Sequence, residues 1–179
     1  MKKIIIIFFA FLLTGCATNM IPAQYQAQNT QQFEATSNFG EVSYLPNENG
    51  KVESNQIQSQ GIVKILLSEN IESFVRRGNI MEFQHSGGNV SNDSNTKIVI
   101  DVERFFVGDL GTRTRWEYEA TYKIFKNDEL AHTKEVVLEP VRMGKGGEAS
   151  DYTPVVTNMI RKGYEAFISD SKVQSILSE

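Results

Sequence analysis

The sequence predicts an α+β fold, a two-layer sandwich in which two helices cover one face of an antiparallel sheet of about four to five strands. Three observations predict it. Apolar residues recur at helical spacing in two segments, 57–77 and 153–168. Apolar and polar residues alternate between these segments, as they do in half-buried antiparallel strands. Turn-forming residues separate the alternating stretches, so the predicted order is β-α-β-β-β-β-α.

The first strand is predicted at 40–45, which alternates weakly and ends at Pro46. A helix is predicted over 57–77, and Gly78, directly after a pair of arginines, fits its C-terminal end. A short alternating segment predicts a strand at 80–84. The apolar residues at helical spacing in the first helix are Ile62, Val63, Leu66, Leu67, Ile71, Phe74 and Val75.

Two long alternating segments, 97–106 and 112–126, predict a hairpin closed by a turn at 108–111. In both segments the even-numbered positions are apolar and are predicted to face the helices. We expect a register in which paired residue numbers sum to about 218, because it sets Glu103 opposite Arg115 and keeps like charges apart.

The last part of the chain predicts a further strand and the second helix. Asn127-Asp128 predicts a tight turn before a strand at 129–138, and a glycine-rich loop follows at 142–150. Thr153-Pro154 starts the helix, with threonine as the N-cap and proline at the first helical position. Ser169-Asp170 is predicted to cap a final short turn.

The N-terminus has the order of a cleaved export signal. Lys2 and Lys3 precede an apolar run at 4–13, which is ten residues long. A membrane-spanning helix needs about 20 apolar residues, so this run fits the apolar part of a signal peptide. It ends at Leu13-Thr14-Gly15-Cys16, which resembles the lipobox of bacterial lipoproteins. The alternative is an ordinary secretory signal with an incidental cysteine.

The lipobox resemblance implies cleavage before Cys16, a diacylglyceryl thioether on its sulfur and an acyl chain on its new amino terminus. Such an anchor exceeds the two acyl chains that stable membrane attachment requires. Ala17 follows the cysteine. By analogy with lipoproteins of enteric-type bacteria, alanine there implies the outer membrane of a Gram-negative bacterium, with the protein facing the periplasm.

These observations divide the chain into three predicted parts. Residues 1–15 are the predicted lipoprotein signal peptide, and 16–38 are the lipidated cysteine with a polar, glutamine-rich segment interpreted as a flexible tether. Residues 39–179 are the predicted single periplasmic domain, which is long enough to bury a core of its own.

The predicted mature chain is acidic. Of 18 Lys and Arg, two lie in the signal, which leaves 16 against 22 Asp and Glu, a net charge of −6. This balance argues against nucleic acid as a partner, because phosphates require a basic surface. Cys16 is the only cysteine, so its lipidation would leave no thiol for catalysis, disulfides or metal binding.

The candidate catalytic and metal sites are weak. Acidic residues on the solvent face of the hairpin suggest either a calcium site or cross-strand ion pairs, and we favour ion pairs because a flat strand face does not converge on an ion. The glycine-rich segment 143–147 lacks the spacing of a phosphate-binding loop, and neither histidine lies in a metal-binding motif. The sequence therefore predicts no enzyme, no metal and no cofactor beyond the acyl chains. The acidic residues are Asp101, Glu103, Glu117 and Glu119.

Four residues are candidates for contact with a protein partner. Phe105 and Phe125 fall on the nominally solvent-facing side of the hairpin, so either a β-bulge turns them inward or they mark a partner surface. Arg142 and Lys145 lie in the glycine-rich loop, where a loop near a helix N-terminus could bind an anion or a partner.

From Phe74 to Leu177 the chain resembles the YajG family of outer-membrane lipoproteins. The resemblance is carried by Arg77-Gly78 before a segment containing Met81, by the strand 98–106 with Gly111 and Trp116-Glu117-Tyr118 after it, and by the last helix. Asn127-Asp128 stands where that family usually has Asn-Gly. The resemblance implies location and fold, and accessory roles in envelope assemblies are typical of similar small lipoproteins.

We therefore expect a non-enzymatic, lipid-anchored envelope protein that binds a protein partner or an envelope polymer. The alternative is a carrier that holds a lipid or glycan between its sheet and its helices, and a hydrolase is the third alternative.

Overall fold

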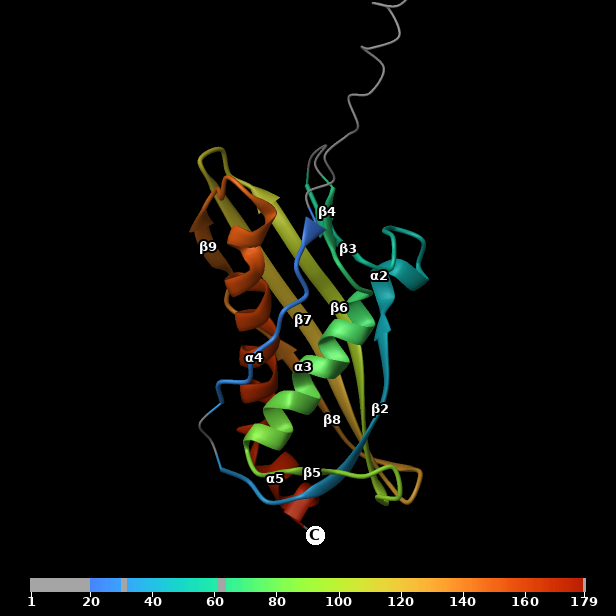
Figure 1. Ribbon diagram of the computed structural model, residues 1–179. Coiled ribbons are helices and arrows are strands. Elements are labelled where there is room, and N and C mark those ends of the chain that lie inside the picture. Colours follow the sequence, from blue (N-terminus) through green and yellow to red (C-terminus); the bar gives the residue numbers. More distant parts are fainter. Residues whose placement is uncertain (1–19, 30–31, 61–63, 179) are drawn as a thin grey trace, which may run out of the picture.

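The computed structural model describes residues 20–29, 32–60 and 64–178, and within them it shows a mixed sheet of nine strands with the helices α3 and α4 on one of its faces (Figure 1). The α+β class is confirmed, and the sheet is larger than predicted. The elements are β1 Met20–Ile21, β2 Thr36–Tyr44, α2 Leu45–Glu48, β3 Gln56–Ser59, β4 Ile65–Leu67, α3 Ile71–His85, β5 Asn89–Val90, β6 Thr96–Asp109, β7 Arg113–Lys126, β8 Glu129–Val137, β9 Val141–Gly144, the 3₁₀ turn η2 Ala149–Tyr152, α4 Thr153–Ile168 and α5 Ser171–Ser178.

The long antiparallel hairpin β6–β7 is the centre of the sheet. β2 and β3 both pair with the free edge of β6, and both run parallel to it. β8 and β9 pair antiparallel with the free edge of β7. The prediction of a purely antiparallel sheet is therefore wrong for β2 and β3. A helix intervenes between them and β6, and such crossovers bring strands together in parallel.

The predicted helix at 57–77 is wrong in its first half, since β3 and β4 occupy 56–59 and 65–67 as a short antiparallel pair. α3 begins at Ile71 and continues to His85, so it also includes the segment 80–84 predicted as a strand. Gly78 lies inside this helix, where an added Cβ would stand 2.8 Å from a methyl carbon of Ile160. This glycine provides close packing between helices and does not end one.

The predicted register of the hairpin is wrong. Ile98 pairs with Ile124 and Val102 with Ala120, and the register then shifts by one residue at Glu103. This irregularity reverses which residues of β6 face the helices, as expected when one extra residue enters a strand with a side-chain period of two. Beyond it, Phe105 faces inward opposite Tyr118.

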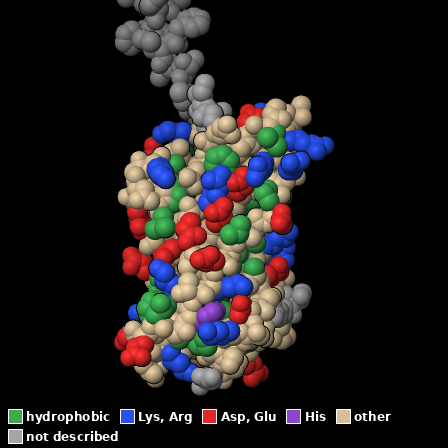
Figure 2. Space-filling model, turned by 180° about the vertical axis from the view of Figure 1, so that it is seen from behind, with side chains coloured by type: hydrophobic (Ala, Val, Ile, Leu, Met, Phe, Trp, Pro, Cys, Tyr) green, Lys and Arg blue, Asp and Glu red, His purple; other side chains and the backbone are tan. Residues whose placement is uncertain are grey.

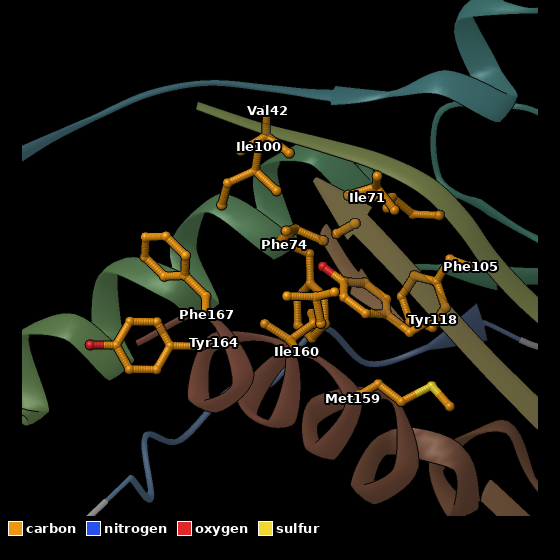
Figure 3. Packing of buried hydrophobic residues seen from close by; sticks show 14 of the residues in the cluster. Val42, Ile71, Phe74, Ile100, Phe105, Tyr118, Met159, Ile160, Tyr164 and Phe167 are labelled. Carbon is orange, nitrogen blue, oxygen red and sulfur yellow. The ribbon is translucent and has the colours of Figure 1, made fainter. Parts of the chain in front are cut away.

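The layer between sheet and helices is filled by large side chains. The even-numbered residues of β7 from Trp116 to Ile124 are buried as predicted, and Thr114 is buried as well. Tyr122 stacks on Phe167 of α4 with ring centroids 4.5 Å apart. Phe105 and Tyr118 pack edge to face with ring centroids 5.5 Å apart, and Figure 3 shows both rings within this layer.

The remaining predicted elements are confirmed with local changes. Asn127 and Asp128 form the predicted tight turn, with φ of 52° and 65°. Part of the predicted loop 142–150 is the short strand β9. α4 begins at Thr153 directly after η2, so Thr153 is the first helical residue and not the cap. Asp170 caps α5 by accepting the backbone N–H of Lys172 at 2.9 Å.

Candidate functional site

Residues 20–29, here called the strap, run between α3 and α4 in the view of Figure 1. The strap begins as β1, which pairs in parallel with β4, and its side chains Ile21, Tyr25 and Asn29 are buried. The prediction of a flexible tether over 16–38 is therefore wrong for the described residues 20–29 and 32–38. Here the chain packs against the domain, and the segment from Thr36 onward is already β2.

The strap is fixed by a buried carboxylate. Glu82 of α3 is fully buried and accepts hydrogen bonds from the Tyr25 hydroxyl at 2.7 Å and from the Asn29 backbone N–H at 2.9 Å. The Gln28 N–H donates to the same group at 3.2 Å. Burial, and then the hydrogen bond to Glu82, raises the pKa of Tyr25 well above its ordinary value. A buried carboxylate is tolerated because these donors replace its water.

The network continues into α4. The Asn29 side chain donates to the Ser86 hydroxyl at 2.9 Å, and the Tyr164 hydroxyl donates to the same oxygen at 3.3 Å. Tyr25 also packs edge-on against Phe74, with ring centroids 5.9 Å apart. The strap is thus joined to both helices by polar and apolar contacts.

The opposite side of the strap forms one wall of an open groove of about 660 Å³. Exposed side chains alternate with buried ones along the strap, so its three glutamines face the groove. The other wall is the first two turns of α4, and β9 contributes Val141 and Met143. The residues of the strap and of α4 that line it are Gln24, Gln26, Gln28, Thr153, Pro154, Val155, Thr157, Asn158 and Arg161.

The chemistry of this groove is that of a binding surface. Its polar groups are carboxamides, hydroxyls and one guanidinium, which Glu165 holds at 2.5 Å and the Asn158 side chain at 2.6 Å. Among the residues that the structure describes, no three His, Cys, Asp or Glu side chains are grouped to hold a metal ion. Sequence reasoning missed the groove, although the alternation of Gln24, Gln26 and Gln28 around Tyr25 is a period-two signal.

The four predicted partner residues do not form one surface. Phe105 is buried, so the prediction that it contacts a partner is wrong and the bulge alternative is correct. Phe125 stays half-buried on the outer face beneath the Lys97 ammonium, which is 5.5 Å from its ring centroid. Arg142 is exposed and pairs with Arg115 near the other end of β7. This position is about 30 Å from Phe125 along the strand. Lys145 is bound to Asp109 at 2.8 Å, which lowers the pKa of that carboxyl.

The outer face of the sheet is a mosaic of positive and negative side chains (Figure 2). Asp101 pairs with Lys123 at 2.5 Å, and Glu117 pairs with Arg104 at 2.5 Å. Glu103 accepts a hydrogen bond from Thr121 at 2.6 Å, and Arg104 lies 3.8 Å from Glu119. The predicted ion pairing is thus confirmed for Asp101, Glu117 and Glu119. Glu103 does not pair with Arg115 as predicted, because the strands pair in a different register along their whole length.

No family model matches the sequence, and no curated protein matches it. Solved structures with the same fold do exist. Protein XCC0632 from Xanthomonas campestris, assigned to the family DUF330, matches with a TM-score of 0.58 and 13% identity, over 88% of this chain and 92% of that chain. The hypothetical protein CT253 from Chlamydia trachomatis matches with a TM-score of 0.51 and 5% identity, over 79% of this chain and 97% of that chain.

A minor lipoprotein from Acinetobacter baumannii matches with a TM-score of 0.43 and 9% identity, over 69% of this chain and 97% of that chain. The first two matches show that this chain shares their fold. The resemblance to the YajG family stays a prediction. No helix within the described residues is long and apolar enough to cross a membrane.

Proposed function

We propose that this chain is a non-enzymatic lipoprotein of the Gram-negative envelope, anchored through Cys16 to the outer membrane and facing the periplasm. The signal-like residues 1–15 and the lipobox support this attachment. The groove between the strap and α4 carries the functional part of the proposal. It is open, has a volume of about 660 Å³ and is lined by groups that form hydrogen bonds, and its described lining residues include no paired nucleophile and base.

The occupant that best fits this groove is an extended segment of a protein partner. Carboxamides pair with both the N–H and the C=O of a peptide backbone, and Gln24, Gln26 and Gln28 offer three of them along one wall of the groove. The apolar side chains of Val141 and Met143, which also line the groove, suit the side chains of such a segment. No aromatic ring is among the described lining residues, which disfavours a glycan that would stack on one.

Lipidation is tested by the intact mass of the protein made in a Gram-negative host. We expect loss of residues 1–15 and addition of three acyl chains, and we expect Cys16→Ser to remain unacylated and leave the membrane fraction. A mature protein with an unmodified cysteine would contradict the anchor.

The groove is tested with a photo-crosslinking amino acid placed at Gln26 or at Thr157 in the full lipidated chain. We expect both positions to capture the same segment of one protein, and a synthetic peptide of that segment to bind the purified domain. Thr157→Arg should abolish this binding by filling the groove. Position 129, exposed on β8 outside the groove, is the control. Adducts to glycan alone, or equal capture from position 129, would refute the peptide groove.

The alternative of a carrier with its ligand between sheet and helices gains no support from the described residues. Trp116, Tyr118, Tyr122 and Phe167 are fully buried and occupy that layer. A ligand retained in native mass spectrometry of the purified domain would favour the carrier over the partner-binding protein.

A further inference from the structure

We infer that one end of the domain rests on the lipid surface, so that the protein stands end-on at the membrane. This end, here called the anchor end, consists of Met20, the β6–β7 turn at Leu110 and the loop 145–148. The inference rests on the proposed lipidation of Cys16, and it adds which surface of the domain meets the membrane.

The first step is the reach of the chain. Cys16 precedes Met20 by four residues, and four residues span at most about 14 Å. Met20 is fixed, because it opens β1 and the strap that follows is bound by Glu82. The long strand β6 has 14 residues and is therefore about 45 Å long. An acylated Cys16 lies at the membrane, so the anchor end lies within about a third of the domain's length from it.

The second step is that separate segments meet at this end. Figure 1 shows the β6–β7 turn at the same end as β1, with α5 at the opposite end. Ile21, Ile65 and the loop around Gly146 line one small pocket of about 90 Å³. The loop is tied to the turn, since the Lys145 N–H donates to the Thr112 carbonyl at 3.2 Å.

The third step is the exposure of apolar side chains there. Met20 is 45% exposed and Leu110 is 50% exposed. Leu110 sits at the tip of a turn that is itself ordered, because its N–H donates to the Arg113 carbonyl at 2.9 Å and the Gly111 N–H donates to Asp109 at 2.8 Å. A rigid turn thus presents a leucine outward at the end nearest the anchor.

Charge disfavours the other orientation, in which the outer face of the sheet would lie flat on the membrane. The outer sheet face carries ion pairs such as Asp101 with Lys123 and Glu117 with Arg104, and pressing these into the headgroup layer would cost their hydration. At the anchor end Lys145 pairs with Asp109, and the charge of the exposed Glu148 is offset by that of Arg113 beside the turn, so this end meets a lipid surface with little net charge. The contact is therefore apolar and should not depend on anionic lipid.

The test places the environment-sensitive fluorescent amino acid dansylalanine at Leu110 in the full lipidated chain, bound to vesicles of phosphatidylethanolamine. Leu130 is the matched control, because this leucine is 57% exposed and pairs with Phe125 at the other end of β7. We expect blue-shifted emission that brominated acyl chains quench at position 110 and not at 130, with the same result when phosphatidylglycerol is added.

Equal signals at both positions, or a larger one at 130, would overturn the end-on orientation. The failure of lipidation is distinguishable, because the intact mass reports it separately. In that case the free Cys16 thiol can be coupled to maleimide-phosphatidylethanolamine, and the same two fluorescent positions then decide the orientation.

Discussion

Replacement of Glu82 by alanine should release the strap. Three donors of the strap converge on this carboxylate, from the Tyr25 hydroxyl and from the backbone N–H groups of Gln28 and Asn29. In Glu82→Ala all three lose their acceptor, and two of them lie in buried positions where water does not replace it.

The magnitude follows from these bonds. A hydrogen bond to a charged group contributes about 1.5–3 kcal/mol net, and each buried donor left without a partner costs about 1–3 kcal/mol. The relief of the desolvated carboxylate offsets several kcal/mol of this sum. We therefore expect Glu82→Ala to lower the free energy of unfolding by about 3 kcal/mol. Tyr25→Phe removes one donor and keeps the ring, so it should cost about 1–2 kcal/mol.

Urea unfolding measures both effects, and the double variant measures their coupling, which should be about 1–2 kcal/mol because the two groups are in contact. Native-state hydrogen exchange adds the local test. The amides of Gln28 and Asn29 should lose protection in Glu82→Ala, while the central amides of β7 change only by the global loss of stability. A cost below about 0.5 kcal/mol with these two amides still protected would refute the role of Glu82 in fixing the strap.

Three further outcomes are expected. Burial raises the pKa of five tyrosines, that of Tyr164 to about 12. The stability that each contributes is therefore complete below about pH 10 and falls above it by about 1.4 kcal/mol per pH unit. Urea unfolding at increasing pH checks this, and a free energy of unfolding that stays constant above about pH 10 would contradict it. Gly163→Ala should cost about 1–3 kcal/mol in thermal unfolding, because its Cβ would lie 2.8 Å from Tyr118, whereas Gly147→Ala, with nothing within 4 Å, should be neutral. Asp128→Gly should raise stability by up to about 1 kcal/mol, since Asp128 has φ of 65° in a turn that favours glycine, and unchanged or lower stability would argue against strain there. The five tyrosines are Tyr25, Tyr44, Tyr118, Tyr122 and Tyr164.

The parts of the fold that could be predicted are those with a long local signal. The alternation in 112–126 is sustained over the whole strand, and β7 is found at 113–126. The segment 57–77 misleads because residues of two short strands and of a helix start happen to fall at helical spacing. Gly78 misleads for a tertiary reason, since its missing side chain makes room for Ile160 and Tyr25.

The candidate site could not be predicted, because the strap is held in place by residues that are distant from it in the sequence. A polar, glutamine-rich segment after a signal is typical of a linker, and nothing within it shows that a buried carboxylate 57 positions after Tyr25 will bind it. The bulge at Glu103 is similar. The sequence permits either an inward or an outward Phe105, and contact with Tyr118 in the core decides between them.

The strap connects the proposed anchor with the proposed binding groove, because the same ten residues set the distance to the membrane on one side and line the groove on the other. If the strap detached, the first fixed strand after Cys16 would be β2 at Thr36, and the chain could then reach about 70 Å. Detachment would also remove the glutamine wall of the groove. Glu82→Ala should therefore weaken both the lipid signal at position 110 and the capture of peptide from position 157. If Glu82→Ala weakened only the lipid signal or only the peptide capture, the distance of the domain from the membrane and its partner binding would be independent properties.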